Sequence, residues 1–163
     1  MRHKTAVALL PVLLSVAGCH IYANIYACKY ETRFVSTRGN ATSPEVGSVM
    51  VEYLNFRQYR PEQPVSNSVS YVAKGEGLTA APTRLALRDS RDLSRIVAEL
   101  GMQTSPVSFA AASAFDVPSG DRDRVFELLA GGYGRLILDL ANDKTMTVAL
   151  IPTTEDWHRP SCD

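Results

Sequence analysis

Few residues of this 163-residue chain are of types that could do chemistry, and the first is Cys19. It directly follows the small residues Val16-Ala17-Gly18. A basic start, Met1-Arg2-His3-Lys4, and a short apolar run from Thr5 to Ser15 precede them. This order of charge, apolar run and small residues is typical of a secretory signal peptide, and the run is too short to cross a bilayer as a helix. We therefore expect the chain to be exported.

Val16-Ala17-Gly18-Cys19 also resembles the lipobox of bacterial lipoproteins. The resemblance implies that the Cys19 thiol receives a diacylglyceryl group, that residues 1–18 are cleaved off, and that the new amine is often acylated. Two or three acyl chains hold a protein stably on a membrane. By the sorting tendency of lipoproteins in Gram-negative bacteria, His rather than Asp at residue 20 favours the outer membrane. If the host is Gram-negative, the resemblance therefore implies a protein on the outer membrane that faces the periplasm. An ordinary signal peptide with an incidental cysteine is the alternative.

Cleavage after residue 18 leaves a mature chain that suits one domain. We expect an anchor and tether over residues 19–30 and a single β-rich domain over residues 31–163. No second apolar stretch approaches the roughly 20 residues that a spanning helix needs.

Two cysteines remain once Cys19 is assigned to lipid, namely Cys28 and Cys162. An even pair in an oxidising compartment is typical of a disulfide. We expect a structural bond between them, worth about 5 kcal/mol less any strain, because it would close a loop of more than 100 residues. Two free thiols or an intermolecular bridge are the alternatives.

Groups suited to catalysis are scarce. After processing, the histidines are His20, beside the anchor, and His158, which we expect in a solvated tail held by Cys162. The tight linear spacing of Glu155, Asp156 and His158 is no metal-site pattern. The chain has no nucleophile elbow, phosphate loop or dinucleotide fingerprint. We therefore predict no catalytic residue, no metal site and no cofactor.

The composition favours a binding or structural module of the bacterial cell envelope that contacts protein or glycan. The 17 basic and 17 acidic side chains give no field for nucleic acid. Our weak choice for a binding surface is an exposed loop over residues 57–64, with Arg57, Tyr59 and Arg60, because aromatic and arginine side chains often anchor partners.

Two other functions stay open. A small hydrolase or metal-dependent enzyme could be built on carboxylates that converge in a pocket with raised pKa values; the candidates are Asp89, Asp92, Asp116, Asp121 and Asp139. A carrier of a small apolar ligand would need a large apolar cavity.

Most of the mature chain predicts strands, because polar and apolar residues alternate or β-branched residues gather. The expected strands are 49–56, 67–73, 83–88, 95–100, 107–115, 135–140 and 145–151, although residues 92–100 also fit a helical turn. The last two strands flank a short polar turn and predict a hairpin.

One short helix is expected near residues 120–130, with Ser119 as its cap and Gly131-Gly132 as its end. Short strands at close spacing with one helix predict an antiparallel β-sandwich or a Greek-key barrel.

The order of these elements resembles the chordin-like (CHRD) domain over roughly residues 47–151. The matching motifs are Gly77-Leu78-Thr79, the run Ile96 to Leu100, and Leu128-Leu129-Ala130-Gly131. The resemblance implies a sandwich or barrel. The histidines usual in that family are absent, since this chain has Arg84 to Leu87 and Asp139 at the corresponding places, so only the scaffold carries over.

Overall fold

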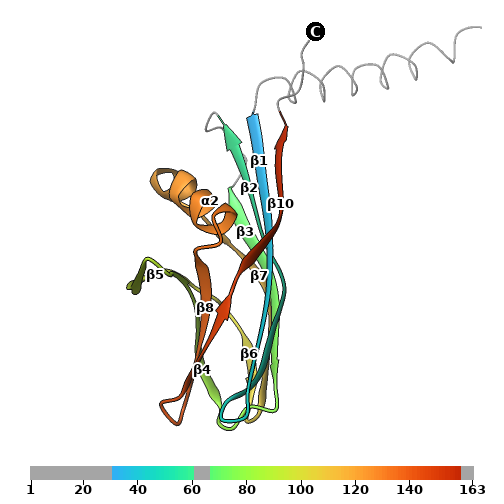
Figure 1. Ribbon diagram of the computed structural model, residues 1–163, viewed down its shortest axis with the longest axis vertical. Helices are drawn as coiled ribbons and strands as arrows, with labels where there is room; N and C mark the ends of the chain where they lie inside the picture. The colour runs from blue at the N-terminus through green and yellow to red at the C-terminus, as the bar shows by residue number, and fades with distance from the viewer. Residues whose placement is uncertain (1–30, 61–66, 159–163) are drawn as a thin grey trace, which may run out of the picture.

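The computed structural model describes residues 31–60 and 67–158, which form a sandwich of two antiparallel sheets (Figure 1). The large sheet has six strands, in the order β10 (Ile151–His158), β1 (Glu31–Ser43), β2 (Gly47–Arg60), β3 (Ser68–Glu76), β7 (Ser108–Asp116) and β6 (Gln103–Ser105). The small sheet has four, in the order β5 (Asp92–Glu99), β4 (Pro82–Asp89), β8 (Gly134–Leu140) and β9 (Thr145–Ala149). The predicted fold class is confirmed, and the two separately bonded sheets make it a sandwich.

The core fills the space between the sheets and continues under the helix. Alternate residues of each strand turn inward, as in β8, where Leu136, Leu138 and Leu140 are buried and their neighbours are half-exposed. The large sheet is longer than the small one, and α2 (Arg122–Ala130) covers the part of its inner face that the small sheet leaves open (Figure 1). Phe126 of α2 packs against Phe56 of β2 there, and both are fully buried. In the part of the chain that the structure describes, no helix is long and apolar enough to span a membrane.

The predicted hairpin and helix end are both confirmed. β8 pairs with β9 around a turn at residues 141–144, in which Asp143 has a positive φ of 60°. At the end of α2, the N–H of Gly132 donates to Leu129 O and that of Tyr133 donates to Leu128 O. This is a Schellman motif with Gly132 at the left-handed position, φ 70°.

The expected Ser119 cap is wrong. Ser119–Asp121 forms a 3₁₀ turn, η1, and α2 begins at Arg122, with Asp121 as its N-cap and without a side-chain capping bond. The Asp121 carboxylate lies 3.1 Å from Nη2 of Arg124 in the same helix. The carboxylate of Asp123 accepts a bond of 2.7 Å from Gln58 of β2. Asp123 therefore connects the first turn of the helix to the large sheet.

Two segments expected to be irregular are strands. Residues 57–60 belong to β2 and are no loop; residues 61–64 lie outside the described part of the chain. The expectation that His158 lies in a solvated tail is also wrong. Residues 151–158 form β10, which pairs with β1. Both segments are too polar to give a strand signal, but each has a neighbouring strand that satisfies its backbone groups.

β1 passes very close to the point at which the chain crosses from β9 in one sheet to β10 in the other. A Cβ on Gly39 would lie 2.4 Å from Ala149 O and 2.8 Å from Val148 Cγ1. Only a glycine allows this approach of two backbones.

We expect Gly39→Ala to lower the free energy of unfolding by about 1–3 kcal/mol, because the added methyl group overpacks the crossing. The measurement is urea unfolding of both proteins. Gly120→Ala is the matched control, since a Cβ there meets nothing within 4 Å. Equal midpoints for the two variants would show that the crossing is not tightly packed.

Candidate ligand site at the open edge of the sandwich

The first half of β4 is an edge of the small sheet. β8 pairs with β4 along one side, from Pro82 to Asp89. On the other side β5 pairs only from Ala86 to Asp89, and one further bond of 2.8 Å joins Leu100 N–H to Leu85 O. The chain then leaves for β6 in the large sheet. Within the described residues, no strand pairs with Pro82–Leu85 on that side.

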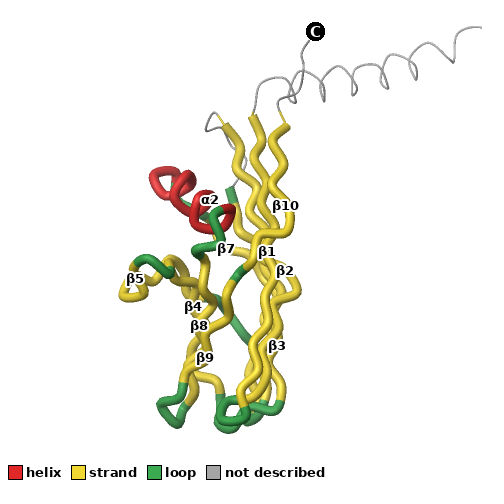
Figure 2. Tube along the Cα trace, in the orientation of Figure 1, coloured by secondary structure: helices red, strands yellow, loops and turns green. Residues whose placement is uncertain are grey.

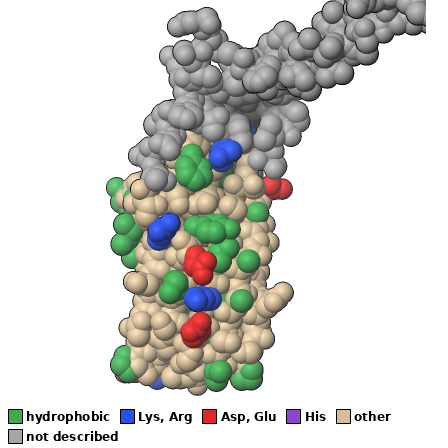
Figure 3. All heavy atoms as spheres, turned by 90° about the vertical axis from the view of Figure 1, so that its right-hand side faces the viewer, with side chains coloured by type: hydrophobic (Ala, Val, Ile, Leu, Met, Phe, Trp, Pro, Cys, Tyr) green, Lys and Arg blue, Asp and Glu red, His purple; other side chains and the backbone are tan. Residues whose placement is uncertain are grey.

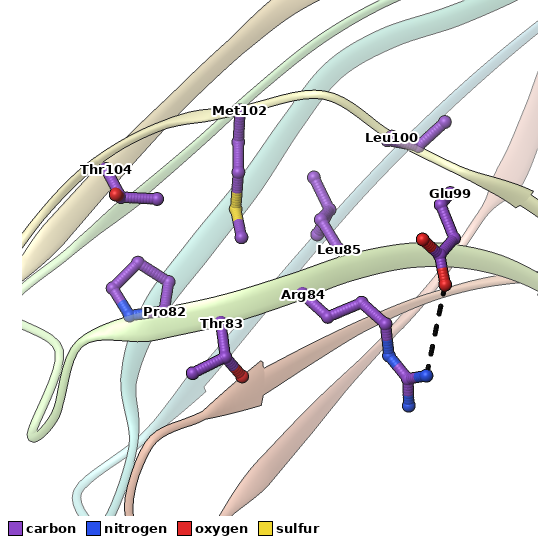
Figure 4. Close-up of a pocket in the computed structure, with 8 residues that line it drawn as sticks. All are labelled: Pro82, Thr83, Arg84, Leu85, Glu99, Leu100, Met102 and Thr104. Atoms are coloured by element: carbon purple, nitrogen blue, oxygen red, sulfur yellow. Dashed lines mark ion pairs between the residues drawn. The ribbon is translucent and has the colours of Figure 1, made fainter.

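A cavity of about 290 Å³ opens beside this edge (Figure 4). One wall is the start of β4 and the other is the segment that leads from β5 into β6. Figure 4 shows Leu85 and Met102 pointing into the gap from opposite sides, whereas Arg84 extends along the other face of β4 toward Glu99. The complete lining is Pro82, Thr83, Arg84, Leu85, Glu99, Leu100, Met102 and Thr104. The accessible surface of the cavity is therefore mainly polar and charged, with Met102 as its half-buried apolar side chain.

The charges of the rim are unequal. Arg84 Nη2 lies 2.7 Å from Asp139 Oδ2, and the Arg84 Nε–H donates to the same oxygen at 2.7 Å. Arg84 Nη1 is 4.0 Å from Glu99 Oε1, a much looser contact, and the Glu99 side chain is 64% exposed. Asp139 thus holds the guanidinium, and Glu99 keeps most of its carboxylate open to a ligand. With two carboxylates to one guanidinium, the rim favours a cationic group.

Arg57, the predicted binding residue whose side chain is described, lies elsewhere. It is exposed on the outer face of the large sheet, opposite Phe34 of β1, with its guanidinium carbon 5.7 Å from the Phe34 ring centroid. Figure 3 shows this face, on which apolar and charged side chains are mixed without a deep hollow. Tyr59 and Arg60 continue β2, but their side chains lie outside the described set. Arg57 is not among the residues that line the cavity beside β4.

None of the carboxylates considered for catalysis lines the cavity, although Asp89 and Asp92 lie opposite each other where β4 meets β5. Asp89 binds Arg91, Asp121 binds Arg124 and Asp139 binds Arg84. The side-chain hydrogen bonds from Arg91 hold the pKa of Asp89 below its ordinary value, the opposite of what a general acid needs. Among the described residues, no three His, Cys, Asp or Glu side chains gather as metal ligands.

Cys19, Cys28 and Cys162 lie outside the described residues, as do residues 1–18 and the whole of the expected tether. Comparison with models of known protein families, with curated proteins and with solved structures finds no match to this chain. The lipoprotein and chordin-like resemblances stay predictions. Where the second would place histidines, Arg84 of β4 lies opposite Asp139 of β8 as an ion pair.

The cavity has no signal in the sequence. Its lining comes from β4, the end of β5 and β6, and only the departure of the chain from one sheet to the other brings these parts together. Arg84 stood in a predicted strand and Glu99 in another, but their spacing matches no ligand motif. What could have been noticed is Pro82, since proline occurs mainly at the start or edge of a sheet strand.

Proposed function

We propose that this chain is a binding module of the bacterial cell envelope, held on a membrane by lipid on Cys19, and that the cavity beside β4 binds its partner. The observation that carries the proposal is the combination of an open strand edge, a half-buried apolar side chain, Met102, and a charged rim at one place. Ligand sites commonly join apolar walls with a few polar groups that fix orientation.

The position of the cavity supports this reading. β1 begins at Glu31, on the side of the expected tether, and runs to a turn at the opposite end of the sandwich (Figure 2). The β3–β4 turn lies at that far end, and Pro82 follows it directly. Thirteen residues of strand span about 40 Å. A protein anchored at Cys19 would therefore present the cavity away from the membrane.

The test is capture of envelope components by the full-length protein in its host membrane, with and without the cavity. Thr104→Trp puts a large side chain on the rim, and Thr147→Trp, at an exposed position of β9, is the matched control. We expect the first variant to lose the captured partner and the second to keep it. If both variants retain the same partners as the wild type, the cavity is not the binding site.

Cys19→Ser tests the anchor in the same strain. We expect this variant to leave the membrane fraction, because the diacylglyceryl group needs the thiol. Retention of the variant on the membrane would remove the localisation on which the proposed function rests.

A further inference from the structure

We propose that the ligand of this cavity is an extended polypeptide segment, with alternating basic and apolar side chains, that adds to the small sheet as a strand beside Pro82–Leu85. This inference rests on the proposed function, since it names the partner of the same site. Its basis is the backbone of β4, which is paired along one side only in this stretch.

The backbone edge open to strand addition is short, because the register with β8 shifts between Pro82 and Arg84 and the Leu85 carbonyl is already bonded. Leu85 O accepts a bond from Leu100 N–H, so the Leu85 carbonyl points toward the cavity side of β4. In an antiparallel ladder the N–H and C=O of one residue both point toward the same neighbouring strand, and those of the next residue point to the other side. Residues two positions apart therefore face the same neighbour. Edges of this kind are templates for an added strand, which gains main-chain hydrogen bonds and takes its specificity from pockets for alternate side chains.

The two faces of the edge set the pattern of the ligand. On the inner face, Leu85 and Met102 border the gap (Figure 4); Leu85 is buried, so the half-buried Met102 gives the apolar contact. On the outer face, Glu99 is exposed and Asp139 is taken up by Arg84. Side chains of a strand alternate between faces. A peptide in this position would therefore turn apolar side chains toward Met102 and a Lys or Arg toward Glu99.

A glycan fits these features less well. Sugar rings are commonly held on an aromatic face, and no aromatic side chain lines the cavity. The edge strand supplies main-chain donors and acceptors at strand spacing, which suits a polypeptide backbone.

The test uses the full-length protein, purified without reductant, and a labelled synthetic peptide, acetyl-Lys-Val-Lys-Val-Lys-Val-amide. Binding is followed by fluorescence anisotropy, and the position of binding by amide chemical shifts. The matched controls are two N-methylated forms of the peptide, each blocked along one of its two edges. The residues Thr145–Ala149 of β9, at the other edge of the small sheet, serve as an internal control.

We expect the peptide to shift the amides of Thr83–Leu85 and to leave those of β9 unchanged. One N-methylated form should bind as the parent does and the other should not bind. Glu99→Gln should weaken the parent peptide about two- to fivefold, with a smaller effect at high salt, as for an exposed ion pair. Arg38→Gln, at an exposed arginine on β1, should not change binding.

Two results would overturn the inference while leaving the proposed function in place. One is loss of the envelope partner in Thr104→Trp without any binding of the peptide, which would assign the cavity to another ligand such as a glycan. The other concerns the chemical shifts. Equal shifts at β4 and β9 would indicate unspecific pairing at both edges of the small sheet, and shifts at β4 that depend on protein concentration alone would indicate binding of a second copy of the chain. If Thr104→Trp also keeps every partner, the proposed function fails with it.

Discussion

The domain in which Cys28 and Cys162 are both changed to serine is expected to unfold with a free energy about 5 kcal/mol lower than that of the oxidised wild type. The expected bond would close a loop of more than 100 residues, and such a loop restricts the unfolded chain strongly. Effects of this size are comparable to the whole stability of many domains. Urea unfolding with and without reductant measures it.

Thr32 and His158 are the outermost partners of β1 and β10 in the described part of the chain. Cys28 and Cys162 lie outside that part, so the bond between them stays a prediction from the sequence.

Reduced wild type is the control for this prediction. It should unfold at the same urea concentration as the double serine variant, because the two chains then differ only by thiols. The intact mass of the wild type should rise on reduction by two hydrogen atoms. A mass that does not change would mean free thiols, and a dimer on a non-reducing gel would mean an intermolecular bridge. Either result contradicts the expected bond.

A strand of this sandwich can be predicted from the sequence where its inward positions carry large apolar side chains. β8 and β9 do, with Leu136, Leu138, Met146 and Val148 buried, and their hairpin was predicted. The inward positions of β1 in its second half are Thr37, Gly39 and Ala41, which are small or polar. Thr37 is fully buried because its hydroxyl donates to Leu54 O at 3.2 Å. A strand that is held by neighbours on both sides needs little hydrophobic signal of its own.

The candidate site was harder to predict for a related reason. Arg57, Tyr59 and Arg60 are predicted as a binding surface because arginine and tyrosine side chains on an exposed loop often anchor partners, but β2 continues as far as Arg60. The cavity depends instead on where β5 stops pairing with β4, which is decided by the crossing to β6. Spacing along the chain carries no information on that crossing. Sequence patterns therefore give the strands of this sandwich better than they give its open edge.

Phe126→Ala should lower the free energy of unfolding by about 3–5 kcal/mol, in the range of large-to-small changes in a core. Phe126 is fully buried, and its ring centroid lies 6.5 Å from that of Phe56. The guanidinium carbon of Arg33 lies 3.7 Å from the same centroid, so the ring also faces a cation in a place largely shielded from water. Truncation removes both contacts and leaves a cavity between α2 and the large sheet.

The effect should be concentrated at the helix, because Phe126 is one of the four buried side chains of α2 and packs on Phe56 of the large sheet. Hydrogen exchange should therefore speed up over Arg122–Ala130 more than over the β8–β9 hairpin. Phe126→Leu keeps most of the volume but not the ring, so it separates packing from the interaction with Arg33. Glu127→Ala, at an exposed position of the same helix, controls for any change in α2. A loss no larger than that of Glu127→Ala, or equal exchange in helix and hairpin, would show that α2 is not held by this contact.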